Sequence, residues 1–548
     1  MTRGHLVGIL LAGLACALNG VGLFDHALWM PDEPREAEIA REYVAREGWV
    51  VPWLNGGRWL EKPPLYHWVA ATLFRWTGSA SPGVARLPSA LAGIGIGACA
   101  WLLARRLGPP GLGPWAAFLA WTSAALLNAA HNATVDALFA FWVVLALTAF
   151  FLGDGGAWDV LAAAAAGLAF LTKLHLGPIL VAVSILGWMA LQGAWKPLKR
   201  LFSPLPILVF LAVIAPWPAL LYHYQHQTDA LHAAVNVLAG HPDAPPTRMG
   251  AESLAEVLWG QLLKRSTGNA YGHAQSPFYY LPNLFTFAAP WSLALVAAIP
   301  WGWRRRKEQP LAAFALAWLV GAVLFLSVPR TKRVVYLLPC VPAVALLVAG
   351  WGREALARWE ASGRIKGIML GLAGLALALS AILPLSELQG SLAWSFVLGG
   401  VALIALLLSR YQPRVGGAVL CGWLVALCLA ADAVWVPALD RRESFVPVSR
   451  EIRRLSGLEG PRTLIGFRLS ENLQGAFGFA LGQRIRCYHE AEHLKDDLAG
   501  GNRLVVMPLE AWQELLTDAE AGRLMRLAGA GEAHGIRFAI AASTRTGP

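Results

Sequence analysis

The stretch PLAAFALAWLVGAVLFLSVPRTKRVVYLLPCVPAVALLVAG, residues 310–350, decides the fold class of this chain. It contains two apolar runs, at 311–328 and 333–350, with a basic segment where they meet. Each run approaches the roughly 20 residues that an α-helix needs to cross a bilayer. We therefore predict two transmembrane helices joined by a short loop.

Apolar runs of this kind recur along the whole chain. Only 14% of the 548 residues are charged and 56% are hydrophobic, whereas soluble domains carry about 25% charged residues. We predict an all-α polytopic membrane domain with about 13 transmembrane helices. The expected helices lie at 5–24, 83–104, 112–130, 135–152, 159–172, 176–194, 203–222, 284–301, 311–328, 333–350, 367–385, 390–409 and 415–437.

The basic loops predict the orientation of these helices, because short loops rich in Lys and Arg face the cytoplasm. With a cytoplasmic N-terminus, thirteen crossings place the C-terminus outside. The clusters that then lie inside are Arg105–Arg106, Lys196/Lys199/Arg200, Arg304–Lys307, Arg353–Lys366 and Arg410/Arg414. A net charge of +11 is explained by these loops and by a site for an anionic phosphate, so no nucleic-acid partner is expected.

One basic cluster, Arg330, Lys332 and Arg333, falls on the outer side in this topology. Either the helix count is wrong by one, or the loop binds an anion. The second interpretation is favoured, because moving the loop inside would place the neighbouring basic clusters outside.

Two long outer loops, 25–82 and 223–283, interrupt the predicted membrane domain, which spans 1–437. Beyond it the hydropathy falls, and short β-like runs at 463–467, 484–488, 504–507 and 537–542 alternate with helical stretches at 471–480 and 509–516. This alternation predicts a small α/β domain at 438–548 on the outer side.

The first outer loop contains MPDEPREAEIAREYV, residues 30–44, with Asp32, Glu33 and Arg35 directly before a predicted helix at 36–46. An acidic residue before Pro and a Glu-rich stretch is a common helix start, and such a carboxylate can also face a cleft. Further on, Glu61–Lys62 precedes two prolines in an aromatic segment. This pair is either a surface ion pair or a functional pair at the bilayer edge, where charges are costly.

A third acidic candidate, Asp136, begins the fourth predicted span in an otherwise uncharged stretch. The second outer loop contains LLKRSTGNAYGHAQSPFYYLPN, which brings Arg265 and His273 close to the membrane. Each of these signals is weak when it is taken alone.

The order of the motifs is more specific: an outer acidic pair, EKPPLY, an outer Asp, HAQSPFYYLP and PRTKRVVYLLP. This order resembles the aminoarabinose (lipid A) transferase branch of the protein O-mannosyltransferase superfamily, which are membrane glycosyltransferases of the GT-C fold. The resemblance covers roughly residues 25–345. This sequence departs from the family's pattern at Pro34, where a hydroxyl residue is usual, and in the loop around 223–267, which is longer here.

The resemblance implies an undecaprenyl-phosphate-linked sugar as donor and an active site that faces the periplasm of a bacterial inner membrane. Catalytic roles would fall to Asp32, Glu33 and Asp136. Contacts to the donor phosphate would come from Lys62, Arg35, Arg265, Arg330, Lys332, Arg333 and Tyr336. Glu61 and His273 resemble a metal-associated pair, so a divalent metal such as zinc is an option, although no cofactor is required.

The expected reaction moves a sugar, 4-amino-4-deoxy-arabinose or a related one, to lipid A or another envelope acceptor, with membrane lipids around the protein. A phosphate leaving group needs cations in a site with little water, and Asp32 is the expected base for the acceptor. Two alternatives stay open: a protein O-mannosyltransferase-like enzyme, and a lipid or sugar transporter or flippase, which would show internal repeats.

Overall fold

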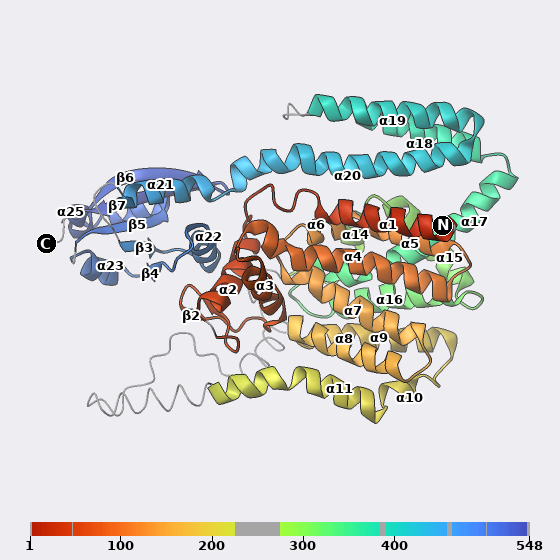
Figure 1. Ribbon diagram of the computed structural model, residues 1–548, viewed down its shortest axis with the longest axis horizontal. Helices are drawn as coiled ribbons and strands as arrows, with labels where there is room; N and C mark the ends of the chain where they lie inside the picture. The colour runs from red at the N-terminus through yellow and green to blue at the C-terminus, as the bar shows by residue number, and fades with distance from the viewer. Residues whose placement is uncertain are drawn as a thin grey trace.

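The computed structural model describes residues 3–46, 48–224, 274–382, 391–457, 463–499 and 501–544 (Figure 1). Helices run side by side along its long axis and form a bundle. Every predicted transmembrane segment overlaps one of them. These helices are α1 (Arg3–Gly20), α4 (Pro82–Leu107), α5 (Leu112–Trp121), α7 (Val135–Leu152), α8 (Ala157–Lys173), α9 (Leu176–Gln192), α11 (Pro204–Ile214), α15 (Ser292–Arg305), α16 (Pro310–Ser327), α17 (Val341–Ala361), α18 (Ile365–Ile382), α19 (Ser391–Tyr411) and α20 (Pro413–Glu443).

Within the described ranges, eight helices are long and apolar enough to cross a membrane. The count rises to nine if α14 (Tyr280–Phe287) and α15, which are bent by 117° relative to each other, form one broken span. Two of the other predicted segments, α5 and α9, are shorter apolar helices. The prediction of an all-α membrane domain is confirmed.

Small residues allow the helices of the bundle to approach closely. A Cβ added at Gly93 of α4 would lie 2.4 Å from Asn19 Oδ1 of α1, and one at Gly97 would lie 2.1 Å from the Trp121 indole of α5. Lipid tails are as apolar as the side chains, so close packing between helices replaces the hydrophobic effect as the source of association.

The first outer loop forms α2 (Glu33–Arg46), a short hairpin of β1 (Trp53–Leu54) and β2 (Gly57–Arg58), and α3 (Leu65–Thr77) at one end of the bundle (Figure 1). The predicted helix at 36–46 is confirmed and begins three residues earlier, at Glu33. α2 is unusual because most of its charged side chains are buried. Buried charges are expensive unless they are paired, so α2 is a candidate location for function.

The C-terminal domain begins after α20, which continues past Pro437 to Glu443 and is followed by α21 (Val446–Gly457). Its sheet has the strand order β4-β3-β5-β7-β6, with β3 parallel to β4 and β5, and β7 antiparallel to β5 and β6. The strands are β3 (Thr463–Phe467), β4 (Arg486–Tyr488), β5 (Arg503–Pro508), β6 (Met525–Ala533) and β7 (Ile536–Ser543).

Four helices accompany this sheet: α22 (Glu471–Leu481), α23 (Ala491–Leu498), α24 (Leu509–Leu515) and α25 (Ala519–Leu524). The predicted α/β character is confirmed. The sequence missed β6, MRLAGAGEA, because Gly and Ala have low strand propensity. β6 forms through its antiparallel pairing with β7.

Candidate active site

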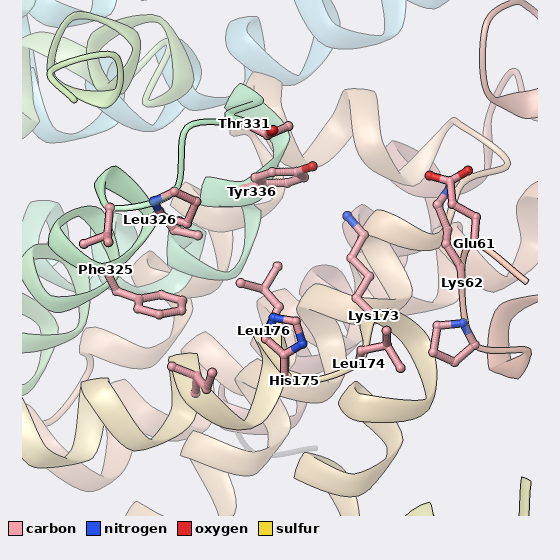
Figure 2. A pocket seen from close by; sticks show the side chains of 14 residues that line it. Glu61, Lys62, Lys173, Leu174, His175, Leu176, Phe325, Leu326, Thr331 and Tyr336 are labelled. Carbon is pink, nitrogen blue, oxygen red and sulfur yellow. The ribbon is translucent and has the colours of Figure 1, made fainter. Parts of the chain in front are cut away.

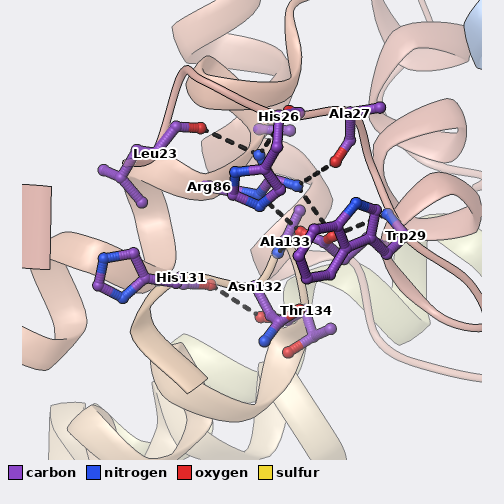
Figure 3. A network of polar contacts seen from close by, with 12 residues as sticks. Leu23, His26, Ala27, Trp29, Arg86, His131, Asn132, Ala133 and Thr134 are labelled. Atoms are coloured by element: carbon purple, nitrogen blue, oxygen red, sulfur yellow. Dashed lines mark hydrogen bonds and ion pairs between the residues drawn. The ribbon is translucent and has the colours of Figure 1, made fainter. Parts of the chain in front are cut away.

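A buried network fixes the loop that precedes α2 (Figure 3). Arg86 of α4 is fully buried, and its Nε and Nη2 donate to the two carboxylate oxygens of Glu33 at 2.8 and 2.9 Å. The same guanidinium donates to the carbonyl oxygens of Leu23, His26 and Ala27. The hydrogen bonds of Arg86 therefore join the end of α1 to α4.

Glu33 accepts two further hydrogen bonds from backbone N–H groups. These come from Trp29 at 2.9 Å and Ala133 at 2.7 Å. With Arg86 on the same carboxylate, Glu33 connects three segments at this end of the bundle, and its side chain is only 2% exposed. This geometry favours an anchoring role for Glu33 over the predicted catalytic one.

The Asp32 carboxylate lies between two arginines: Arg35, which follows it in α2, and Arg333 from the distant loop before η3 (Val334–Cys340). Its Oδ1 accepts a hydrogen bond from Arg35 Nη2 at 2.9 Å, and its Oδ2 accepts one from Arg333 Nη2 at 2.8 Å. Burial alone would raise the pKa of Asp32, but Lys62, Arg35 and Arg333 together hold it below its usual value. Asp32 is therefore ionised at neutral pH.

Glu36, which shares Arg35 with Asp32, is fully buried, and its carboxylate contacts three polar side chains. Lys62 Nζ donates to its Oε1, Arg35 Nη2 donates to the same oxygen at 3.1 Å, and His67 Nε2 lies 2.8 Å from its Oε2. Burial raises the pKa of Glu36, but Lys62, His67 and Arg35 hold it well below its usual range. Glu36 thus fixes the position of Lys62, and Lys62 faces the cavity described below.

A second acid–base pair lies across the site, at the start of α7 and the end of α8. Lys173 donates to Asp136 Oδ1, and its Nζ lies 4.9 Å from the ring centroid of Tyr336. Tyr336 belongs to the 3₁₀ helix η3 (Val334–Cys340), directly after Arg333. The charge of Asp136 also acts on the Arg333 guanidinium, so Arg333 links the Asp32 and Asp136 pairs.

A cavity of about 290 Å³ opens between these groups (Figure 2). Lys173 projects into it between Tyr336 and the Glu61–Lys62 pair. The polar side chains that line it are Glu61, Lys62, Lys173, His175, Thr331 and Tyr336, and the apolar ones are Pro63, Leu174, Leu176, Ile179, Phe325, Leu326, Val328 and Pro329. The cavity thus has both cationic and extended apolar walls.

The backbone is strained where α8 meets α9 at this cavity. Leu174 has φ 54° and ψ −142°, a region that side chains other than glycine rarely adopt. The sharp turn presents Lys173 and His175 to the same cavity.

The structure brings together Asp32, Arg35, Lys62, Arg333, Asp136 and Tyr336, and Glu61 lines the same cavity. Arg330 points away as an exposed side chain. Lys332 is buried and donates to the backbone carbonyls of Pro329 and Gln275, so it shapes the loop. Arg265 and His273 lie outside the described residues.

The described part of the chain contains no group of three or more His, Cys, Asp or Glu side chains that could hold a metal ion. A stable zinc site takes about four ligands, and of the two predicted ones only Glu61 is described. The metal-associated pair therefore stays a prediction, because His273 lies outside the described residues.

Sequence reasoning missed four residues of the site: Glu36, His67, Arg86 and Lys173. Glu36 was counted as an ordinary helix residue, and His67 follows EKPPLY without a motif of its own. Arg86 and Lys173 each stand as an isolated cation beside an apolar run. That placement could have identified Arg86 and Lys173 as candidates, because a charge at the membrane edge is expensive unless it is paired.

Comparisons with known proteins show which proteins this chain is similar to. The family model described as dolichyl-phosphate-mannose-protein mannosyltransferase matches residues 61–220. The undecaprenyl phosphate-alpha-4-amino-4-deoxy-L-arabinose arabinosyl transferase of Edwardsiella ictaluri is 30% identical over 370 residues, which is 65% of this chain and 62% of that protein. Arabinosyl transferase 2 of Pseudomonas fluorescens is 32% identical over 390 residues, 69% of this chain and 65% of its own length.

The fold comparison extends over the whole chain. The crystal structure of ArnT from Cupriavidus metallidurans bound to undecaprenyl phosphate matches with a TM-score of 0.73 and 21% identity, covering 100% of both chains. The chain therefore has the same fold, including a C-terminal domain. The sequence matches span less than two thirds of each curated relative. The resemblance stated from the motifs is confirmed.

Proposed function

We propose that this chain, a relative of the aminoarabinose transferases with their GT-C fold, is an integral membrane glycosyltransferase. It moves a sugar from a polyprenyl-phosphate donor to an acceptor of the cell envelope. The relatives are named for undecaprenyl-phosphate-linked 4-amino-4-deoxy-L-arabinose, so this donor is the first candidate, with lipid A as the acceptor. The enzyme resides in the bacterial inner membrane, with its active site facing the periplasm.

The observation that carries this proposal is the cavity lined by Lys62 and Lys173. A polyprenyl phosphate joins an anionic head to an apolar chain, and this cavity offers Lys62 and Lys173 together with an apolar wall formed by residues such as Leu176 and Phe325. Cations paired with carboxylates stay in place and charged in such a site. The wall of α9 and α16 then takes the first units of the lipid chain.

The charged side chains of the site suggest how the sugar is transferred. As the bond from the sugar to the phosphate breaks, negative charge grows on the leaving phosphate, and Lys62, Lys173 and Arg333 stabilise it. Asp32, held ionised by its cationic neighbours, accepts the proton of the acceptor hydroxyl. Direct attack from the opposite side of the sugar inverts the anomeric centre. Asp136 keeps Lys173 aimed at the phosphate.

The test is a transfer assay with the purified protein in liposomes, undecaprenyl-phosphate-linked aminoarabinose and lipid A. The wild-type chain is expected to transfer the sugar. Asp32→Asn is expected to lose about 10²–10⁴-fold in turnover while it still binds undecaprenyl phosphate. Asp25→Asn is the matched control, because Asp25 lies in the same loop and its side chain is exposed. Full activity of Asp32→Asn would remove Asp32 as the base.

The same assay separates the alternatives. The matching family model is named for protein mannosylation, so mannose transfer from a polyprenyl phosphate to a Ser/Thr peptide would identify the acceptor as protein. Movement of the intact donor lipid between leaflets without transfer would identify a flippase.

A further inference from the structure

We propose that α22 of the C-terminal domain is a positioning element of the active site, in which Asn472 and the close packing at Gly475 hold Arg35 against Asp32. This inference rests on the proposed function, because it gives the C-terminal domain a part in the same reaction. α22 lies beside α2 (Figure 1).

The first argument is a direct hydrogen bond between the domains. Arg35 Nη1 donates to Asn472 Oδ1 at 3.0 Å, across 437 positions of the chain. The Nη2 of the same guanidinium donates to Asp32 and Glu36. One acceptor from the C-terminal domain, Asp32 before α2 and Glu36 of α2 therefore set the orientation of Arg35.

Among the residues that the structure describes, no further hydrogen bond holds this guanidinium. Arg35 Nε is buried and has no hydrogen-bond partner among the described residues. A long, flexible side chain keeps one orientation only when its donors are engaged. Asn472 is the acceptor that prevents Nη1 from turning away while Nη2 stays on the carboxylates.

The second argument is how closely the backbones of α22 and α2 approach each other. A Cβ at Gly475 would lie 2.6 Å from Arg35 Cα and 3.0 Å from Arg35 N, closer than real Cβ atoms come. Three residues on, a Cβ at Gly478 would lie 2.8 Å from Glu38 Oε1. Residues three apart share a face of a helix, so α22 presents a glycine face to α2.

Further contacts hold the C-terminal domain in its position beside α2. Trp59 Nε1 donates to Glu471, and the Trp59 ring centroid lies 5.5 Å from both Arg35 Cζ and Lys62 Nζ. The Asn55 side chain bonds both backbone groups of Ile485, at 2.6 and 2.8 Å. The C-terminal domain thus contacts α2, the β1–β2 hairpin and the segment that leads to Lys62.

The experiment compares Gly475→Ala and Asn472→Ala in the full-length protein with Gly522→Ala. Gly522 is a matched control, because it is a helical glycine of the same domain and a Cβ there meets nothing within 4 Å. Hydrogen–deuterium exchange of the α2 amides reports docking without any reference to activity. Steady-state kinetics of sugar transfer report catalysis.

Gly475→Ala is expected to speed amide exchange in α2. Both variants are expected to lower kcat at least tenfold while the KM for the donor changes less, because the phosphate rests on Lys62, Lys173 and Arg333. Asn472→Asp keeps an acceptor oxygen for Arg35 and is expected to restore most of the turnover. A purely structural role would lower the amount of folded protein, with no rescue specific to Asp.

Wild-type kcat in stable Gly475→Ala and Asn472→Ala proteins would overturn the inference. So would a loss that Asn472→Asp does not reverse, or α2 exchange in Gly475→Ala equal to that in Gly522→Ala. A wild-type protein without transfer activity would instead overturn the proposed function, and the exchange data would still show whether α22 holds α2.

Discussion

Arg333 donates a 2.8 Å hydrogen bond to Asp32, a residue 301 positions earlier in the chain. Arg333 comes from the loop between α16 and η3, and Asp32 directly precedes α2. The bond joins this loop to the start of α2. One cation of the Arg330, Lys332 and Arg333 cluster is thus the partner of the Asp32 carboxylate.

The first prediction concerns the pH dependence that this bond creates. Lys62, Arg35 and Arg333 lower the pKa of Asp32, so its ionised form persists to lower pH than in a free Asp. Arg333→Ala removes one of these cations and raises that pKa. The acid limb of kcat/KM for sugar transfer is therefore expected to move to higher pH.

Arg330→Ala provides the comparison in the same loop, because its side chain is exposed, and its acid limb is expected to stay in place. Identical profiles for Arg333→Ala and the wild type would show that Asp32 does not control the limb.

A second prediction concerns Lys173, which the sequence analysis overlooked. Lys173→Ala removes a cation from the cavity and leaves Asp136 without its ion-pair partner. Donor binding and turnover are both expected to fall at least tenfold, as measured by titration with undecaprenyl phosphate and by the transfer assay. Lys199→Ala, an exposed lysine of α10 (Leu198–Leu201), is the control. Unchanged donor affinity in Lys173→Ala would assign the phosphate to other cations.

The third prediction tests a buried hydroxyl group in the cavity wall. Thr331 is 7% exposed, and its Oγ1 has no hydrogen-bond partner in the described part of the chain. An unsatisfied buried hydroxyl costs about 1–3 kcal/mol, so a bound ligand that bonds to it recovers this energy. Thr331→Val is expected to raise the melting temperature of the free protein and to weaken donor binding.

Thr331→Ser keeps the hydroxyl and is expected to bind the donor like the wild type. If Thr331→Val and Thr331→Ser bind the donor equally well, the hydroxyl takes no part in recognition.

The fourth prediction separates anchoring from catalysis at Glu33. Removing one member of a buried ion pair leaves the other charge unpaired, at a cost of about 3–5 kcal/mol. Arg86→Ala and Glu33→Ala are each expected to lower the stability of the outer face by this order in thermal or denaturant unfolding. Arg105→Ala, an exposed arginine on the same helix, is expected to be neutral. A Glu33→Gln protein of normal stability without turnover would restore the catalytic role that the sequence suggested.

The sequence alone determined the class of the fold. Runs of about 20 apolar residues have one stable arrangement in a bilayer, because every backbone polar group must be bonded within its own helix. The order of EKPPLY, PFYYLP and PRTKRVVY was sufficient to identify the family resemblance. Four of the five strands of the C-terminal domain also followed from local pattern.

Only the tertiary structure decided which charges belong together. Asp32 and Glu33 are neighbours in the chain, yet Asp32 pairs with Arg35 and Arg333 while Glu33 pairs with Arg86. The side chains of adjacent residues at a helix start point in different directions, and partners from other segments set the role of each. Partners from other segments likewise join Lys173 to Asp136 and Arg35 to Asn472. Except for the local Asp32–Arg35 pair, these pairings arise from helix packing over long separations, which no local pattern in the sequence records.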